Sequence, residues 1–233
     1  MKKITTAIIL LSLLFGNGSF NKPQLSVTGA WHEQKDDDEA VIICTHGYII
    51  IAEFNQINTS FIYSSGGSYT EKKAGQLVVD VDFSNRKKDA EFVGTKGAMV
   101  YSISGDQMTV TMNDGVKRVV TRVDDGGGEL AGAWRLSARM NSGRMEAVPD
   151  GPVKMIKVLS ATRFQWVSFN TETNEFIASG GGTYTFKDGK YTEHIEFYAK
   201  DSYKIGTSQA FDATIDKNVW VNKAQEEWTR VGN

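Results

Sequence analysis

The chain comprises 233 residues with a formal net charge of −2, 40% hydrophobic residues and a single cysteine. This mildly acidic balance argues against nucleic-acid binding, which depends on a basic surface, so we expect no nucleic-acid partner. A single cysteine excludes an intrachain disulfide, so each domain must be stabilised by its own core.

The first 24 residues are predicted to be a signal peptide with a short leader. Lys2 and Lys3 precede an apolar stretch over residues 4–15, and small residues follow it, an order typical of a cleavable secretory signal. The stretch is shorter than the roughly 20 apolar residues of a transmembrane helix, and no cysteine stands nearby for a lipid anchor. We therefore expect a secreted or periplasmic protein whose mature chain has no transmembrane segment. An uncleaved anchor is the alternative.

Three short motifs occur twice in the same order, which indicates a tandem duplication. The second copies follow the first by 103, 115 and 108 residues. The pairs are Gly29-Ala30-Trp31 with Gly132-Ala133-Trp134, Gly66-Gly67-Ser68-Tyr69-Thr70 with Gly181-Gly182-Thr183-Tyr184-Thr185, and Thr121-Arg122-Val123 with Thr229-Arg230-Val231. We predict one domain over residues 25–124, a flexible glycine linker over 125–128, and a second domain over 129–233.

The secondary-structure pattern of both domains is almost entirely β. Short apolar or alternating runs are separated by Gly, Asp and Asn, and no helical periodicity persists over three turns. The first domain has predicted strands at residues 30–34, 40–44, 48–54, 61–70, 77–83, 98–104, 108–112 and 117–123. The second has them at 133–140, 154–159, 164–169, 183–186, 191–198, 207–215, 219–222 and 227–231. About eight hairpin-linked strands per domain predict two tandem up-and-down antiparallel β-barrels. A sandwich is the alternative, and pairing of the first strand with the last would decide between them.

The Gly-x-Trp opening and the closing Arg of each domain resemble the signature of the calycin superfamily, which includes the lipocalins. The resemblance implies that Arg122 packs across Trp31, and Arg230 across Trp134, at the closed end of each barrel. Such a cation–π contact is worth roughly 0.5–2 kcal/mol. These four residues are therefore expected to be structural.

The second domain also resembles a narrower family, the lipocalin-like domains of uncharacterised secreted proteins of Bacteroidetes-type bacteria. The resemblance covers nearly all of residues 129–233, whereas the first domain shares only the landmarks. The runs that carry it lie at residues 130–136, 162–167, 180–185, 191–197 and 227–230. It implies a fold and a compartment but no established activity, and both domains are shorter than a typical lipocalin.

Candidate ligand residues concentrate in the second domain. In the strand at 191–198 one face carries Tyr191, Glu193, Ile195 and Phe197, and the other carries Thr192, His194, Glu196 and Tyr198. The second set could bind a polar head group, although the solvated side of a half-buried strand would look the same. Aromatic residues complete the predicted site, which comprises Trp166, Tyr184, His194, Glu196, Tyr198 and Trp228. The alternative is that these rings fill the core, because about eight strands leave an interior just wide enough for side chains. The irregular stretch at 140–152 corresponds in position to the lid loop of lipocalins.

These observations predict a non-catalytic protein that binds a small, partly apolar molecule in the second barrel. An interaction module with filled barrels is the first alternative. An enzyme acting on glycans through Glu193, Glu196 and Glu227 is the second, because paired carboxylates perform that chemistry. No motif of hydrolases, nucleotide-binding proteins or metalloproteases is present, and the three histidines are too dispersed to indicate a zinc site. We expect no cofactor and no metal.

Overall fold

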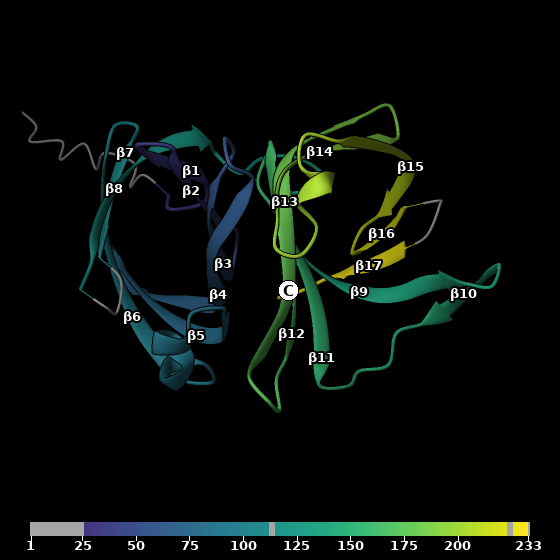
Figure 1. Ribbon diagram of the computed structural model, residues 1–233, viewed down its shortest axis with the longest axis horizontal. Helices are drawn as coiled ribbons and strands as arrows, with labels where there is room; N and C mark the ends of the chain where they lie inside the picture. The colour runs from purple at the N-terminus through teal and green to yellow at the C-terminus, as the bar shows by residue number, and fades with distance from the viewer. Residues whose placement is uncertain (1–25, 112–114, 223–225, 233) are drawn as a thin grey trace, which may run out of the picture.

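The computed structural model describes residues 26–111, 115–222 and 226–232 and consists of two antiparallel β-barrels side by side (Figure 1). The predicted signal peptide lies outside the described residues. In each barrel the first strand pairs with the last, so the barrels are closed and the sandwich alternative is wrong. The prediction of two tandem all-β barrels is confirmed. No helix within the described ranges is long and apolar enough to cross a membrane.

Barrel 1 contains eight strands in sequential order. They are β1 (Gly29–Lys35), β2 (Asp38–Cys44), β3 (Tyr48–Asn55), β4 (Ser60–Lys73), β5 (Gln76–Ser84), β6 (Lys96–Ser104), β7 (Gln107–Thr111) and β8 (Lys117–Asp124). A short 3₁₀ helix, η1 (Lys87–Phe92), joins β5 to β6. Trp31 on β1 pairs directly with Arg122 on β8, which closes the barrel.

Barrel 2 repeats this order and adds one short strand. Its strands are β9 (Gly132–Asn141), β10 (Arg144–Ala147), β11 (Val153–Leu159), β12 (Arg163–Asn170), β13 (Glu175–Lys187), β14 (Lys190–Tyr198), β15 (Ser208–Asp216), β16 (Val219–Asn222) and β17 (Glu226–Arg230). The 3₁₀ helix η2 (Ser202–Lys204) joins β14 to β15. The barrel closes between β9 and β17.

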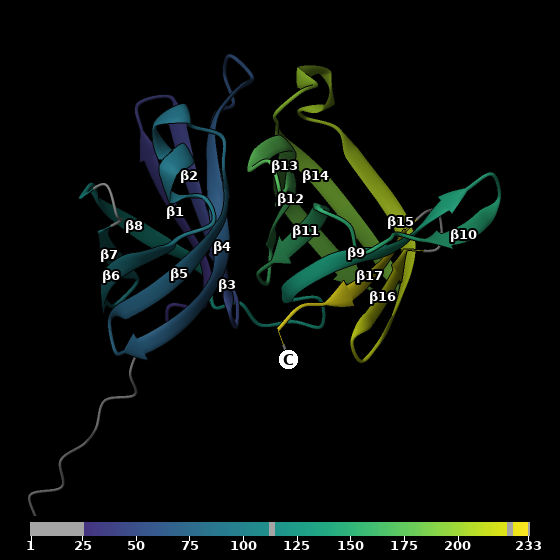
Figure 2. The same ribbon diagram turned by 90° about the horizontal axis from the view of Figure 1, so that it is seen from below.

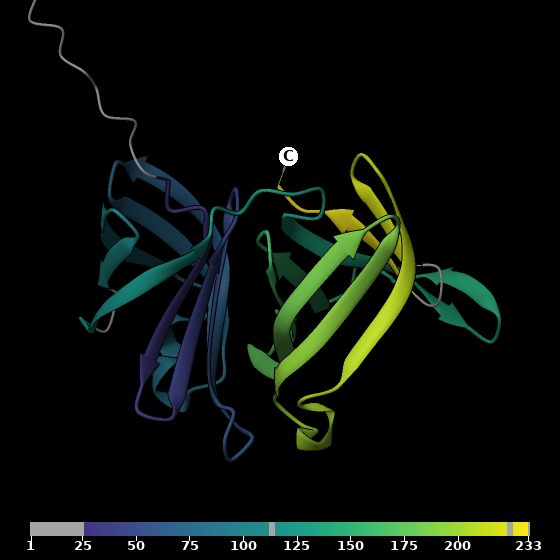
Figure 3. The same ribbon diagram turned by 90° about the horizontal axis from the view of Figure 1, so that it is seen from above.

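The predicted lid loop at residues 140–152 begins as a β-hairpin instead. Ser142 and Gly143 both adopt positive φ angles, 48° and 81°, as a tight hairpin turn requires, and β10 therefore folds back onto β9 with Met145 opposite Met140. The hairpin projects outward from barrel 2 (Figures 2 and 3). It does not lie across a barrel end.

One end of each barrel is closed by a stacked tryptophan and arginine, in the arrangement that the calycin resemblance implies. The guanidinium carbon of Arg122 lies 4.0 Å from the Trp31 ring centroid, and that of Arg230 lies 4.1 Å from Trp134. Both indoles donate a 2.8 Å hydrogen bond to a backbone carbonyl four residues earlier. Each arginine also donates to two carbonyls of the segment that precedes its barrel. These four side chains are occupied in closing the barrels.

The two barrels pack against each other through a shared apolar cluster on β3, β4, β12 and β13 and their neighbours. Phe54 stacks on Phe197 at 4.8 Å between centroids, and Phe83 stacks on Phe169 at 5.4 Å. The strand registers relate Phe54 to Phe169 and Phe83 to Phe197 as repeat equivalents. Each contact is therefore the repeat counterpart of the other, as in a two-fold symmetric dimer interface.

Hydrogen bonds to barrel 2 fix Asp124, the residue immediately before the predicted flexible linker. The carboxylate of Asp124 accepts hydrogen bonds from the turn between β11 and β12, namely from Ser160 Oγ, the backbone N–H groups of Ala161 and Thr162, and Thr162 Oγ1, at 2.6 to 3.2 Å. Burial alone would raise the pKa of Asp124, but these hydrogen bonds outweigh it and the pKa is lowered. The ionised carboxylate therefore fixes barrel 2 to the end of β8.

Candidate functional site

The interior of barrel 2 contains a cavity of about 260 Å³. Along β9 its lining begins at Arg139, five residues beyond Trp134, so it lies toward the barrel end opposite the Trp134–Arg230 contact. Aromatic rings from β12, β14, β15 and β17 form much of its wall. They are those of Trp166, Tyr198, Phe211 and Trp228.

A glycine immediately before the repeated motif allows two of these rings to approach each other. Trp166 and Tyr198 make an edge-to-face contact at 5.3 Å between centroids. Gly180 lies beside them, and a Cβ there would stand 2.9 Å from both Trp166 Nε1 and Tyr198 Cδ2. Any larger residue would push into this ring pair, so Gly180 shapes the cavity wall.

A buried ion pair forms the polar part of the cavity. Lys157 Nζ donates to Glu193 Oε1 at 2.7 Å, and the two residues are 6% and 8% exposed. Tyr191 Oη donates to the same oxygen at 2.8 Å. Burial first, and then the adjacent Glu193 charge, raise the pKa of Tyr191 well above its usual value. Tyr191 therefore remains a neutral hydrogen-bond donor.

Aromatic rings also surround the Lys157 ammonium group. Its nitrogen lies 4.9 to 5.7 Å from four ring centroids, those of Trp228, Trp220, Tyr191 and Phe164. Such rings attract a cation through their negative faces. The protein therefore supplies its own cation to this aromatic enclosure.

A β-bulge decides which side chains of β14 face the cavity. Gly182 pairs with Ile195 but Gly181 pairs with Phe197, which leaves Glu196 as the extra residue. A Cβ at Gly182 would lie 2.1 Å from the His194 carbonyl oxygen, so only glycine permits this approach. Simple alternation therefore fails after Glu196.

The bulge separates the residues that the sequence placed on one face. Tyr191, Glu193 and Ile195 face the interior before it, Tyr198 faces the interior after it, and Phe197 packs in the interface between the barrels. The structure therefore divides each of the two sets of side chains that simple alternation assigned to opposite faces of this strand.

Two residues of the predicted site lie outside the cavity, on the face of β14 opposite Glu193 and Ile195. His194 is exposed and its Nδ1 is 3.0 Å from Ser208 Oγ. Glu196 makes an ion pair with Arg163 on the side facing barrel 1. Burial raises the pKa of the Glu196 carboxyl, although Arg163 acts in the opposite direction.

The remaining four predicted residues are buried or line the cavity. Trp166, Tyr198 and Trp228 line it. Tyr184 lies in the core and donates a 2.7 Å hydrogen bond to the Ser160 carbonyl. The structure therefore brings three of the six together, and their role in ligand binding stays a prediction.

Sequence reasoning missed the polar residues of the cavity. Lys157 offered a signal, because it is a charged residue within the otherwise apolar end of β11. Glu193 was not among the predicted ligand residues. The cavity lining also contains Gln209, Asn222 and Glu226.

The three carboxylates considered for glycan chemistry occupy separate environments. Glu193 faces the cavity, Glu196 lies on the opposite side of its strand, and Glu227 accepts a 2.8 Å hydrogen bond from Ser137 Oγ without lining the cavity. Among the described residues no three His, Cys, Asp or Glu side chains are arranged to hold a metal ion. Burial raises the pKa of the Cys44 thiol to about 12, so the thiol is unreactive.

Barrel 1 provides an internal comparison for the ion pair. Strand registers make Ile42 the repeat equivalent of Lys157, and Val79 the equivalent of Glu193. At two more positions a polar residue of barrel 2 corresponds to a small or apolar residue of barrel 1. Gln209 corresponds to Gly97, and Asn222 corresponds to Val110. The fold therefore closes around an apolar interior when these positions are apolar. Replacing a buried ion pair by packed apolar residues is often neutral or stabilising, so stability alone does not account for the pair in barrel 2.

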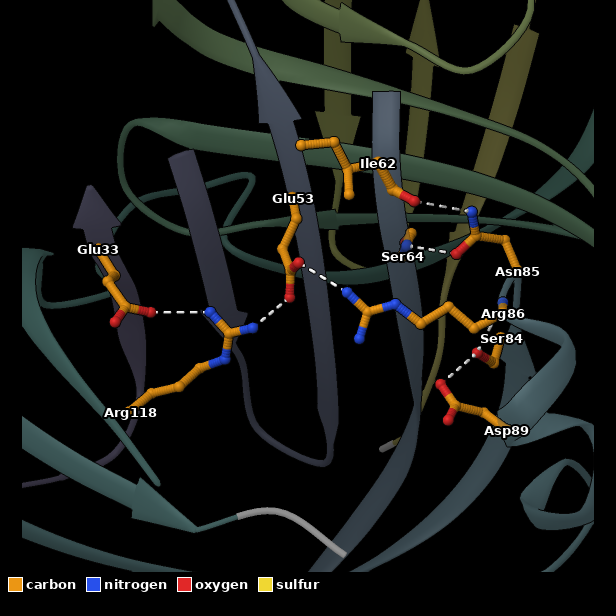
Figure 4. A network of polar contacts seen from close by, with 9 residues as sticks. All are labelled: Glu33, Glu53, Ile62, Ser64, Ser84, Asn85, Arg86, Asp89 and Arg118. Carbon is orange, nitrogen blue, oxygen red and sulfur yellow. Dashed lines mark hydrogen bonds and ion pairs between the residues drawn. The ribbon is translucent and has the colours of Figure 1, made fainter. Parts of the chain in front are cut away.

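An ion-pair chain spans the corresponding end of barrel 1 (Figure 4). Arg118 bonds both Glu33, at 2.8 Å, and Glu53, and Glu53 accepts in turn from Arg86 at 2.7 Å. Arg86 also stacks over the Tyr63 ring at 3.6 Å. The chain links β1, β8, β3 and the segment after β5. Beneath it the cavity is apolar and smaller, about 110 Å³.

Barrel 2 lacks this closure. Its β17 residue equivalent to Arg118 is Glu226, and Leu136 and Ser168 occupy the positions of Glu33 and Glu53. One carboxylate and two neutral side chains cannot form the chain. The larger, polar cavity is therefore in the barrel without the ion-pair closure.

Two closed eight-stranded barrels, each ended by a Trp–Arg stack, define a protein with a lipocalin-like fold. Residues 129–232, which form barrel 2, match the family model described as "Domain of unknown function (DUF4488)". No curated protein matches the chain.

Among solved structures, one match is the Helicobacter pylori beta clamp bound to a DNA ligase peptide. It is 7% identical over 89% of this chain and 59% of that chain, with a TM-score of 0.17. The chain thus spans about 59% of the length of that protein. A similarity at this level carries no argument about fold or function.

Proposed function

We propose that barrel 2 binds a small, partly apolar molecule non-covalently, and that the protein is a secreted or periplasmic binding protein. The observation that carries this proposal is the buried Lys157–Glu193 pair beside a cavity of about 260 Å³, where barrel 1 has Ile42 and Val79. An apolar wall with a few placed polar groups is the usual composition of a small-molecule site.

The size of the cavity limits the ligand. Sites for drug-sized molecules measure about 300–1,000 Å³, and the barrel 2 cavity lies just below this range. A molecule with one ring, packed against Trp166 and Tyr198, suits these dimensions. Its polar group would meet the polar side chains that line the cavity.

Barrel 1 has a supporting role in this proposal. Its ion-pair chain and apolar interior leave less room, and its interface with barrel 2 holds β12 and β13, from which Trp166 and the glycine motif come. The proposed compartment rests on the sequence of residues 1–24 and on the resemblance to secreted lipocalin-like proteins of Bacteroidetes-type bacteria.

Native mass spectrometry of the mature protein, produced by secretion, tests the proposal. We expect an adduct that is released on denaturation and is lost in Trp166→Ala. Ile51→Ala, which truncates the repeat-equivalent residue in barrel 1, is the matched control and should retain the adduct. An adduct lost in Ile51→Ala but kept in Trp166→Ala would contradict the assignment to barrel 2.

A further inference from the structure

The charged residues around the barrel 2 cavity are unequal in number. Among the described residues that line it, three are cations, Arg139, Lys157 and Lys204, and two are carboxylates, Glu193 and Glu226. Lys157 pairs with Glu193 at 2.7 Å, and Arg139 with Glu226 at 3.5 Å. Within the described part of the chain, Lys204 has no carboxylate within 4.0 Å. Among the described lining residues, Lys204 is therefore the one cation that is not held in an ion pair, although the Asp201 charge lies near enough to act on it.

Lys204 stands directly beside the aromatic wall. Its ammonium nitrogen donates to Tyr198 Oη at 3.3 Å and lies 4.6 Å from the Tyr198 ring centroid. Tyr198 in turn contacts Trp166 edge to face. The hydrogen bond with Tyr198 raises the pKa of Lys204, so the side chain is charged at neutral pH. An apolar surface and a cation thus adjoin at one place in the cavity.

The other charges restrict what this cation would attract. A second negative charge on the ligand would face Glu193 and Glu226, which favours a monoanion over a dianion such as phosphate. A cationic ligand would find the aromatic enclosure already occupied by the Lys157 ammonium group. Both observations favour a single negative charge on the ligand.

We propose that the barrel 2 site selects a small monoanion with a flat apolar body, of the aromatic carboxylate class. The ring packs against Trp166 and Tyr198, and the carboxylate pairs with Lys204. This inference rests on the proposed function, because it names the ligand class of the same cavity.

Calorimetric titration with three probes of one shape tests the charge preference. The probes are benzoate, benzamide and benzylamine, which carry a negative, no and a positive charge at pH 7. We expect benzoate to bind about tenfold tighter than benzamide, as one charge-assisted hydrogen bond allows. Benzylamine should bind weakest. The preference for benzoate should diminish with added salt, because Lys204 lies at the solvent-accessible side of the cavity.

Variants assign the preference to Lys204. Lys204→Gln should remove the difference between benzoate and benzamide and leave benzamide affinity nearly unchanged. Lys88→Gln, on the corresponding 3₁₀ helix of barrel 1, should leave both affinities unchanged. If Lys204→Gln keeps the preference, or if benzamide or benzylamine binds wild type as tightly as benzoate, the inference is wrong.

The same titrations separate this inference from the proposed function. Equal binding of benzoate and benzamide, abolished in Trp166→Ala, would overturn the charge preference and support the cavity as a binding site. Absence of binding by all three probes, together with a mass spectrum free of adducts, would overturn both.

Discussion

Exchanging the buried ion pair for its barrel 1 counterparts separates a structural from a functional role of Lys157 and Glu193. In Lys157→Ile, the Glu193 carboxylate keeps only the hydrogen bond from Tyr191. Removing one partner of a buried pair costs about 3–5 kcal/mol, because an uncompensated charge remains. Glu193→Val strands the Lys157 ammonium in the same way, although the surrounding rings offset part of this cost.

The double variant Lys157→Ile/Glu193→Val reproduces the side chains that barrel 1 has at these positions. Replacing a buried ion pair with apolar residues changes stability by about 0 to +4 kcal/mol. Against this, Tyr191 Oη loses its acceptor, which costs about 1–3 kcal/mol. We therefore expect the double variant to lie within about 2 kcal/mol of wild type and to be more stable than either single variant. Ligand binding in barrel 2 should be lost.

Urea denaturation followed by tryptophan fluorescence measures these effects. Four of the five tryptophans lie in barrel 2, and only Trp31 lies in barrel 1, so the fluorescence reports mainly on the mutated barrel. The matched control is Ile42→Val in barrel 1, which should cost about 0.5–1.5 kcal/mol and preserve binding. A double variant as unstable as Lys157→Ile would refute the reasoning, because the ion pair would then be required for folding.

Two further predictions concern Asp124 and Gly180. Asp124→Asn should lower the free energy of unfolding by about 2 kcal/mol, because charged hydrogen-bond acceptors contribute about twice as much as neutral ones. Because the folded-state pKa of Asp124 is lowered, its stabilisation is present above the unfolded pKa of about 3.9 and is lost as the pH falls through the folded value. Urea midpoints measured against pH should therefore fall less steeply below about pH 4 in Asp124→Asn than in wild type, and parallel curves would contradict this. Gly180→Ala should destabilise the protein by about 1–3 kcal/mol through overpacking and abolish the adduct, as thermal denaturation and native mass spectrometry would show. Gly151→Ala, where an added Cβ meets no atom within 4 Å, is its control.

The duplication and most of the strands of each domain could be predicted from the sequence, whereas closure of the barrels was decided by the pairing of first and last strands. The duplication and the strands follow from local and periodic information. Alternating side chains define strands, glycine-rich turns define hairpins, and motifs repeated 103 to 115 residues apart define the duplication. The Trp31–Arg122 and Trp134–Arg230 contacts were implied by the resemblance to the calycin superfamily, and the pairing of first and last strands brings them about.

Which side chains of β14 face the barrel 2 cavity depends on how this strand pairs with β13 in the folded protein. Alternation along β14 fails after Glu196, because Gly182 approaches the His194 carbonyl and forces one residue out of register. That approach depends on the pairing of two strands, so no pattern within β14 alone could reveal it. Phe197 therefore packs between the barrels and Tyr198 lines the cavity, the reverse of what alternation predicts. Glu193 meets Lys157, a residue 36 positions away on another strand. The hydrogen bonds of Asp124 and the phenylalanine interface likewise join residues that are distant in sequence. Side-chain periodicity can be read along a single strand. A binding site, in contrast, is formed by several strands, and the register between those strands is established only when the barrel folds.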